Sequence, residues 1–233
     1  MIVLASTKQT LSESQENYIK QIFLLTEDIG VQSAGTQSLA DRLAVAPASV
    51  TVMAQRLRDL GLVQYFEYKG VSLTLLGRKV ALEIIRHHRL LESFLCKALG
   101  YGWDEVHEEA EKLEHHISET LEARMAAWLG NPEVDPHGDP IPNADLIFMC
   151  DTPKDSLIGV REGFSGRIVR VATQDRDELN LLSQLHLTPG QHVQVIAVEP
   201  GGVRVGVSSP DSKTNRFLLP AALASKILVQ DEE

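Results

Sequence analysis

The first 75 residues hold the pattern that most constrains the fold, which is three helical segments followed by a hairpin. Helical patterns are predicted over residues 14–26, 37–44 and 47–60, and Pro47 suits the first position of the third helix. Two β-prone runs then flank the pair Lys69-Gly70, which is a turn signal. This order predicts a winged helix-turn-helix, a motif that presents one helix to the major groove of DNA.

The predicted third helix has one apolar face and one more polar face. Val50, Met53, Leu57 and Leu60 recur at helical spacing, so we expect them to pack inward. Small side chains at the start of the opposite face allow close approach to base edges, and Arg and Lys reach phosphates. The residues predicted to contact DNA are Pro47, Ala48, Ser49, Thr51, Val52, Gln55, Arg56 and, in the hairpin turn, Lys69. Winged helices also serve as protein-interaction modules, and this pattern alone leaves that alternative open.

The charge of the chain argues against a general binder of polyanions. The formal net charge is -10, whereas affinity for nucleic acid depends largely on Lys and Arg that neutralise phosphates. Within residues 1–75 the charges nearly balance, because six Lys or Arg face seven Asp or Glu. DNA binding is therefore expected to be local or conditional, and the acidic excess lies further along the chain, where a cation could use it.

The rest of the chain predicts two further domains. A helical pattern runs from residue 75 to Gly100, and a second helix is expected from about 103 to 129. The Pro- and Gly-rich stretch 130–143 is predicted to be a loop or linker. Beyond residue 151, short β-prone runs such as SLIGV and HVQVIAV predict a small β-barrel-like domain. The predicted fold class is mainly α with a small β domain, and the predicted domain bounds are 1–74, 75–143 and 151–233.

Carboxylates and imidazoles share faces on the two long predicted helices. His88 and Glu92 are four residues apart, and a second stripe carries His107, Glu111, Glu114 and His115. So many acids on one face repel one another unless they are exposed or hold a cation. Each residue could also belong to a solvated surface, but the joint pattern favours a divalent metal site. His87, His116 and His137 lie off these stripes or in the predicted linker and are left unassigned.

Oxygen and nitrogen ligands without a thiolate favour Mn(II) or Fe(II) over a structural zinc site. Cys96 and Cys150 form no CxxC pair, so both are expected to be reduced thiols, with burial favoured over reactivity. No stretch approaches the roughly 18 apolar residues of a membrane span, and the start of the chain lacks the features of a secretory signal. A cytoplasmic protein without membrane contact is therefore expected.

Five motifs give the chain a family resemblance over nearly its whole length. The segments LADRLAVAPASVTVMAQRLRDLGLV, KGVSLTLLGR, RHHRLLESFL, EVHEEAEKLEHHIS and HGDPIP occur in the order found in the diphtheria-toxin-repressor family. The C-terminal domain is similar to the SH3-like module of the longer members and to FeoA. The resemblance implies a homodimeric, metal-activated repressor of metal-homeostasis genes that binds a palindromic double-stranded DNA operator, with metal as corepressor.

The resemblance also implies two metal sites per subunit. The primary site would use Glu111, Glu114, His115 and Asn17. The ancillary site would use His88, Glu92, His107, Asp175 and Glu178. Iron-responsive members carry Cys at the position of Glu111, whereas manganese-responsive members carry Glu there, which favours Mn(II) with Fe(II) as the alternative.

Two positions depart from the manganese-responsive pattern. Asn17 replaces an Asp, and Lys20 stands where some members have a ligating Glu. A two-manganese cluster is therefore not expected, and a single primary ion per subunit is predicted beside the ancillary one.

Two other classes of function compete with this interpretation. A carboxylate-and-histidine cluster could hold a metal that activates water, as in a metal-dependent hydrolase. The chain lacks HExxH and G-x-S-x-G motifs, so an enzyme is not expected. A winged-helix regulator that ignores metal is the third possibility, and DNA binding that survives chelation would favour it.

Overall fold

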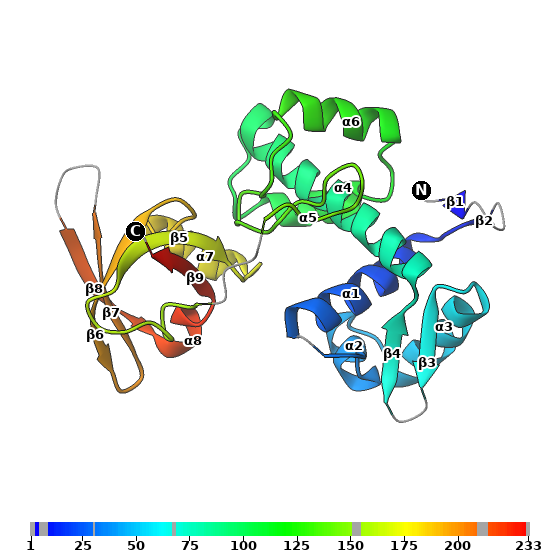
Figure 1. Ribbon diagram of the computed structural model, residues 1–233, viewed down its shortest axis with the longest axis horizontal. Coiled ribbons are helices and arrows are strands. Elements are labelled where there is room, and N and C mark those ends of the chain that lie inside the picture. Colours follow the sequence, from blue (N-terminus) through cyan, green and yellow to red (C-terminus); the bar gives the residue numbers. More distant parts are fainter. Residues whose placement is uncertain are drawn as a thin grey trace. The chain divides into compact units, whose positions relative to one another are not determined.

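The structure is a computed structural model that describes residues 3–4, 9–29, 31–66, 69–150, 155–208 and 214–231. The chain forms two compact units. The first comprises Met1–His88, Glu111–Arg124 and Pro142–Ile147, and the second comprises Arg89–Ala110, Met125–Ile141 and Phe148–Glu233. Figure 1 labels the helices and strands of both. None of the described helices is long and apolar enough to cross a membrane.

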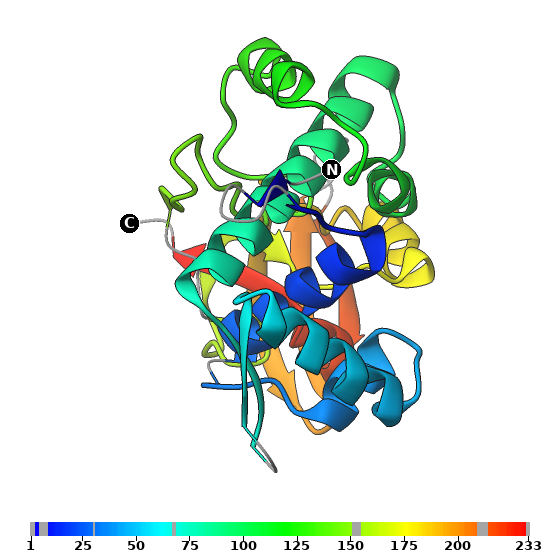
Figure 2. The same ribbon diagram turned by 90° about the vertical axis from the view of Figure 1, so that its right-hand side faces the viewer.

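The first unit contains the predicted winged helix-turn-helix, with the elements in the expected order. A short pair of antiparallel strands, β1 (Val3–Leu4) and β2 (Gln9–Thr10), precedes it. The motif itself consists of α1 (Glu13–Ile29), α2 (Thr36–Arg42), α3 (Pro47–Asp59), β3 (Val63–Phe66) and β4 (Gly70–Leu73). Figure 2 shows the hairpin of β3 and β4, in cyan, beside the N-terminal helices.

Local signals explain where these elements begin and end. Ser12 and Gln15 form a capping box at the start of α1, because the Ser12 N–H donates to Gln15 Oε1 at 2.9 Å and the Gln15 N–H donates to Ser12 Oγ at 3.3 Å. Gly70 has φ +101°, and a Cβ there would lie 2.2 Å from the Ala34 carbonyl oxygen. Only glycine fits, since the segment at Ala34 pairs with β4 at this point.

The inward face of α3 differs slightly from the predicted one. Val50 and Leu57 are buried as expected, but Ala54 is the third buried residue, and Met53 is only half-buried. An alanine in the middle of the helix lets its backbone approach the neighbouring elements closely. Of the residues on this helix that are predicted to contact DNA, all but the half-buried Thr51 are exposed.

The predicted second long helix is wrong, because the structure divides it into two. After α4 (Leu75–Leu99), which Thr74 caps by accepting the Gly77 N–H at 3.1 Å, the chain forms α5 (Val106–Leu113) and α6 (Glu119–Trp128). Between them, the Ser118 hydroxyl accepts the Leu121 N–H at 3.3 Å and starts α6 as a new helix. Helical spacing alone did not reveal this cap.

Residues 130–143 form no helix or strand, and of the two predicted alternatives, loop or linker, the structure shows a packed loop. Asp135, His137 and Asp139 are 6 %, 0 % and 6 % exposed. The Asp135 carboxylate folds the loop by accepting the N–H groups of His137 at 2.8 Å and Asp139 at 2.9 Å. Gly138, with φ +86°, lies so close to the Val169 carbonyl oxygen that a Cβ would stand 2.0 Å from it. Residues 130–141 of the loop are a packed part of the second unit.

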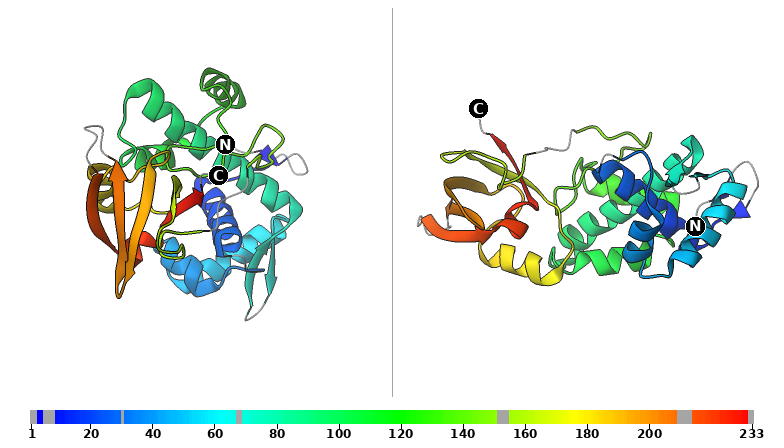
Figure 3. Two further views of the ribbon diagram at one scale, coloured as in Figure 1. Left: turned by 60° about the vertical axis from the view of Figure 1, so that its left-hand side comes forward. Right: turned by 90° about the horizontal axis from the view of Figure 1, so that it is seen from below.

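The C-terminal residues form a five-stranded antiparallel sheet of order β8-β7-β6-β5-β9. Its elements are β5 (Ser165–Val171), α7 (Arg176–Gln184), β6 (His192–Glu199), β7 (Gly202–Ser208), β8 (Thr214–Pro220), α8 (Ala221–Ala224) and β9 (Ile227–Asp231). Figure 3 shows its strands side by side in yellow to red. Alternate residues such as Val193, Val195, Val203 and Val205 are fully buried in its core.

This sheet agrees with the predicted small β-barrel-like domain and differs from it in two details. Its order is open among the described residues, with β8 and β9 as edges. The SLIGV run predicted as a strand makes only a single bridge, from Ser156 to Leu228. The fifth strand is β9, and Leu179, Leu182 and Leu223 of the unpredicted helices α7 and α8 join the core instead of further strands.

Candidate metal centre

The first cluster of polar groups begins on α1. Glu16 and Lys20 lie one turn apart and are only 1 % and 3 % exposed, although both are charged. Asn17 lies beside Glu16 on the same helix. Charged groups this deeply buried need partners of opposite charge or a bound ion. Those partners come from α4 and from the end of α5.

His115 connects α1 to the turn after α5. Its Nδ1 atom lies 2.6 Å from Glu16 Oε2, and its Nε2 atom lies 2.9 Å from Asn17 Oδ1 and 3.4 Å from Glu114 Oε1. A carboxylate that holds one ring nitrogen fixes the tautomer and aims the other nitrogen. Here the aimed nitrogen faces two oxygen atoms. A divalent cation between the three atoms would suit this donor set, because all three are ligands of Mn(II) and Fe(II).

Lys20 occupies the neighbouring position. Its Nζ atom lies 2.7 Å from Glu111 Oε1, 2.7 Å and 3.0 Å from the two oxygens of Glu114, and 3.2 Å from His88 Nδ1. His88 Nδ1 in turn lies 2.5 Å from Glu114 Oε2. The carboxylates of Glu111 and Glu114 therefore form ion pairs with the ammonium group of Lys20.

The pKa of Glu114 is lowered by these neighbours. Burial by itself raises the pKa of this carboxyl, but the hydrogen bond from His88 and the charge of Lys20 outweigh it. Glu114 is thus an anion in the folded protein, as a metal ligand must be.

A second cluster lies in the second unit, around Glu92. This residue is 0 % exposed, and its Oε1 atom lies 3.2 Å from His107 Nδ1. Its Oε2 atom lies 3.7 Å from His137 Nδ1. Ligand atoms of Glu92, Asp135 and His137 all lie within 4.8 Å of one another, and all three residues are buried. Two carboxylates and an imidazole in a buried site are a candidate metal-ligand set.

His137 is oriented for such a role. Its Nε2 atom lies 2.7 Å from the Trp103 carbonyl oxygen, to which it donates, and its ring stacks on the Trp103 ring. Its Nδ1 atom is buried and makes no hydrogen bond to any described residue. Burial lowers the pKa of His137, but Glu92, Asp135 and the Trp103 carbonyl outweigh it and raise the pKa to about 9. A cation at Nδ1 would replace a proton there.

The charged form of the Asp135 carboxyl is disfavoured in this cluster. Its pKa is raised well above the usual range, first by burial and then by the charges of Asp139 and Glu92. Arg89 lies 3.9 Å from Asp135 and 3.5 Å from Asp139, and Arg170 lies 2.7 Å from Asp139. These two arginines offset only part of the acidic charge.

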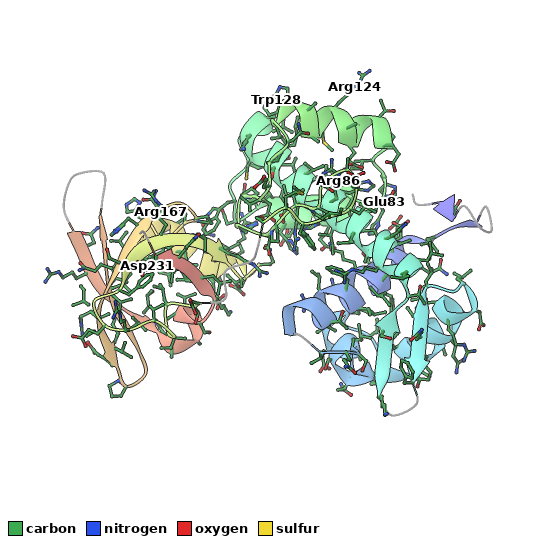
Figure 4. The ribbon with its side chains drawn as sticks, viewed as in Figure 1. Glu83, Arg86, Arg124, Trp128, Arg167 and Asp231 are labelled. Carbon is green, nitrogen blue, oxygen red and sulfur yellow. The ribbon has the colours of Figure 1, made fainter. Side chains whose placement is uncertain are left out.

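A separate ion-pair network joins α4 to the start of α6 and lies outside both clusters. Glu122 pairs with Arg86 and with His87 Nε2, the latter at 3.0 Å. The pKa of Glu83 is raised to about 7, first by burial and then by Glu119. Figure 4 labels Glu83 and Arg86 on α4, and Arg124 and Trp128 on α6.

The predicted ligands fall into three groups in the structure. Asn17, Glu111, Glu114 and His115 come together in the first cluster, and His88 contacts this cluster through Glu114. Glu92 and His107 lie together in the second.

Asp175 and Glu178 form the third group, and the contacts described for them lie within residues 155–231. Asp175 caps α7 by accepting the Glu178 N–H at 3.0 Å, and both oxygens of Glu178 lie 2.7 Å from Lys226 Nζ. The pKa of Glu178 is lowered, first by the hydrogen bond from Lys226.

Sequence reasoning missed Glu16, Asp135 and His137. Glu16 stands next to Asn17, so its position beside a predicted ligand was visible. Asp135 and His137 stand in an Asp-x-His pair within the predicted linker, and only their burial reveals them.

The candidate DNA surface lies on α3 and the hairpin turn. Pro47, Ala48, Ser49, Val52, Gln55, Arg56 and Lys69 are exposed, and Thr51 is half-buried. Val52 is 49 % exposed, so an apolar side chain is available for contact on this face. Arg56 and Lys69 add positive charge to the same motif.

Three family models match consecutive parts of the chain. The model described as "Iron dependent repressor, N-terminal DNA binding domain" matches residues 10–71. The model described as "Iron dependent repressor, metal binding and dimerisation domain" matches residues 74–143, and the FeoA domain matches residues 156–231.

Individual relatives and solved structures agree with these models. The chain is 29 % identical to the iron-dependent repressor IdeR of Mycobacterium leprae (strain TN), over 94 % of this chain and 98 % of that protein. It is 38 % identical to the HTH-type transcriptional regulator MntR of Bacillus pumilus (strain SAFR-032), over 45 % of this chain and 71 % of that one. A structure described as a manganese-dependent transcriptional repressor in complex with manganese has 35 % identity and a TM-score of 0.83, over 94 % of this chain and 100 % of that chain. The manganese regulator SloR has 29 % identity and a TM-score of 0.73, over 94 % and 98 %.

Proposed function

The chain belongs to the iron-dependent repressor family, the family of the diphtheria-toxin repressor, and from this premise we propose that it is a Mn(II)-activated repressor of metal-homeostasis genes. The family consists of metal-dependent DNA-binding repressors. The choice of Mn(II) is supported by the ligand chemistry. The first cluster offers carboxylates, an amide oxygen and imidazoles, which are hard or intermediate donors.

The cysteines lend no support to a soft-metal site. Among the described residues, neither Cys96 nor Cys150 falls in any group of three or more candidate ligands. Burial, followed by the charges of Glu92, Asp135 and Asp104, raises the pKa of Cys96 to about 11. Deprotonation of this thiol is therefore unfavourable in the metal-free protein. Fe(II) is the second candidate, because relatives that match most of this chain are named iron-dependent.

The primary metal position is proposed at Asn17, Glu114 and His115, with Glu111 beside it. A bound divalent cation would supply the positive charge that these oxygen and nitrogen atoms lack. Glu16 orients His115 toward this position through its bond to Nδ1. Asn17 belongs to α1, and α1 packs against α2, α3 and β4. Ligands from α1 and from the end of α5 therefore couple occupancy of the site to the position of the recognition helix.

A second metal position is proposed at Glu92, Asp135 and His137, with His107 beside Glu92. The buried Nδ1 atom of His137 and the raised pKa of Asp135 support it, because a cation would relieve both. The ancillary set taken from the resemblance included Asp175 and Glu178, and their participation stays a prediction.

The proposal includes a homodimer that reads a palindromic operator. Residues 1–74 would act as the DNA-binding domain, 75–143 as the metal-binding and dimerisation domain, and 151–233 as the FeoA-like domain. Leu99 and Trp128 are 61 % and 59 % exposed, so the helical domain has apolar side chains that a second subunit could cover. The face formed by Ala48, Ser49, Val52 and Gln55 would read base edges.

The observation that carries the proposal is the convergence of Asn17 Oδ1, Glu114 Oε1 and His115 Nε2. The test is DNA binding by fluorescence anisotropy to palindromic operator candidates at one fixed salt concentration, with chelator, Mn(II), Fe(II) or Zn(II). We expect tight binding only with Mn(II) or Fe(II), and we expect its loss in Glu114→Ala. The matched control is Glu108→Ala, an exposed acid on α5. Binding that ignores metal and Glu114→Ala would exclude the corepressor switch.

A further inference from the structure

The ammonium group of Lys20 occupies a ligand set that a metal ion would suit. His88, Glu111 and Glu114 form one of the groups whose ligand atoms lie within 4.8 Å of one another. The Nζ atom of Lys20 contacts all three of these residues, at 2.7 Å to 3.2 Å. The cation of this group therefore comes from the chain itself.

Because Lys20 is buried, breaking its ion pairs with these carboxylates requires much free energy. Lys20 is 3 % exposed, and the carboxylates of Glu111 and Glu114 are its charged partners. Removing one member of a buried ion pair leaves an uncompensated charge, which is strongly unfavourable. Lys20 is thus a fixed part of the cluster in the metal-free protein.

The charge of the whole cluster fits a single divalent ion. Glu16, Glu111 and Glu114 contribute three negative charges, and Lys20 contributes one positive charge. With neutral imidazoles the remaining charge is two negative units, which one divalent cation at Asn17, Glu114 and His115 would neutralise. A second divalent cation would leave the cluster positive and would also have to share space with the ammonium.

We propose that Lys20 is a built-in cation that takes the place of a second metal ion and restricts the first cluster to one divalent ion per subunit. The proposal rests on the function proposed above for this cluster. It makes Lys20 the residue that determines metal number, whereas Asn17, Glu114 and His115 hold the ion. Replacing Lys20 with an acid should convert the cluster into a two-ion site.

The test counts Mn(II) ions per subunit by equilibrium dialysis with elemental analysis, on the full chain. The triple substitution Glu92→Gln, Asp135→Asn and His137→Gln first removes from the count both the second cluster and the carboxylate that it shares with the ancillary set implied by the resemblance. In this background we expect one ion per subunit with native Lys20 and two with Lys20→Glu. Lys20→Met vacates the position without adding a ligand, and we expect a second, weaker ion. Lys97→Glu makes the same charge change at an exposed position of α4 and should leave one ion.

The outcomes separate this proposal from the proposed function. Two ions with native Lys20 would overturn it, and that measurement needs no substitution at Lys20 that could impair folding. One ion in every Lys20 variant would also overturn it, and tighter binding of that one ion would identify Lys20 as a competitor that the metal displaces. If the protein with native Lys20 bound no ion and Lys20→Glu bound one, the proposed primary metal position would be contradicted. The proposal that Lys20 excludes an ion would still hold. If no variant bound an ion, both the proposed metal-dependent function and the proposed role of Lys20 would be contradicted.

Discussion

Glu16 Oε2 accepts a hydrogen bond from His115 Nδ1 over 2.6 Å, and this contact joins two segments that lie 99 residues apart in the sequence. One partner belongs to the first helix of the winged domain, and the other follows α5. The bond leaves Nε2 of His115 facing Asn17 and Glu114. A residue that binds no metal itself thus decides how the ligand is presented.

Glu16→Gln should weaken Mn(II) binding to the first cluster by about 10- to 100-fold, because the imidazole loses the carboxylate that fixes its tautomer. Isothermal titration calorimetry with Mn(II) measures the change. Glu13→Gln is the matched control, since Glu13 lies on the same helix with its side chain 64 % exposed. Equal affinities for Glu16→Gln and the native protein would contradict the orienting role.

Asn17→Asp should strengthen Mn(II) binding by about tenfold, which corresponds to roughly 1.4 kcal/mol. A carboxylate replaces a neutral amide oxygen 2.9 Å from His115 Nε2, and the ionic attraction to the metal increases. The metal concentration needed for half-maximal DNA binding should fall accordingly. An unchanged or higher concentration would mean that Asn17 does not contribute to the site.

The pair of substitutions Asp135→Asn and His137→Gln should lower the number of bound Mn(II) ions by one per subunit. These residues supply an oxygen and a nitrogen to the second cluster. Asn lacks the negative charge of Asp135, and Gln lacks the imidazole nitrogen of His137. Metal analysis after dialysis gives the count. His116→Gln is the control, because its side chain is 60 % exposed and pairs only with Glu13 in the recorded ion pairs of the described residues. An unchanged count would exclude this cluster as a metal site.

Arg56→Ala should weaken binding to all DNA sequences alike, because an exposed arginine on α3 is placed to contact phosphate. The slope of the logarithm of affinity against the logarithm of salt concentration should fall in magnitude by about 0.9. Gln55→Ala should instead change the preference among operator variants, since an amide side chain reads base edges. Anisotropy titrations at several salt concentrations distinguish the two. A preserved salt slope in Arg56→Ala would place that residue outside the interface.

Glu122→Gln should destabilise the protein by about 1 to 3 kcal/mol near pH 6, because it removes the negative charge and one of the two oxygens that accept hydrogen bonds from Arg86 and His87. Burial raises the pKa of Glu122, but the bonds from His87 and Arg86 outweigh it and lower the pKa. Its contribution is therefore present above the unfolded pKa of about 4.3 and is lost as pH falls through the folded pKa.

His87 determines how the stabilisation from this ion pair is lost as the pH rises. Burial lowers the pKa of His87, but the hydrogen bond and charge of Glu122 raise it above the ordinary value. The stability gained from His87 is fully present below about pH 6.5 and is lost as pH rises through the raised pKa. Thermal melts of the native protein and of Glu122→Gln from pH 3 to pH 9 should show the largest difference in Tm between about pH 5 and 6.5. A difference that grows toward pH 3 would contradict this assignment.

The N-terminal domain could be predicted from the sequence almost element by element. The helices expected at 14–26, 37–44 and 47–60 are found at Glu13–Ile29, Thr36–Arg42 and Pro47–Asp59. Their boundaries depend on Pro47, on a capping box and on Gly61 with φ +75°, which act within a few residues. Nearby residues therefore carried the information that this part of the fold needs.

Elsewhere, distant contacts overrode the local pattern. The single helix expected from 103 to 129 breaks where Ser118 caps a new helix, and the apolar run at 156–160 pairs only at Ser156. Loop 130–143 looked like a linker because it is rich in Pro and Gly. It packs nevertheless, since the Val171 N–H donates to the His137 carbonyl oxygen at 2.8 Å and thereby joins the loop to β5.

By itself, the sequence determined the winged-helix motif, the family resemblance and the ligand types of the metal region, because these depend on residue identity and on short spacings along helices. Only the tertiary structure decided that Lys20 meets Glu111 across 91 positions and that Glu16 meets His115 across 99. It also decided that His137 is buried against Glu92 and Asp135. Such contacts arise when separate segments pack together, and helical spacing describes only the positions of residues within one segment.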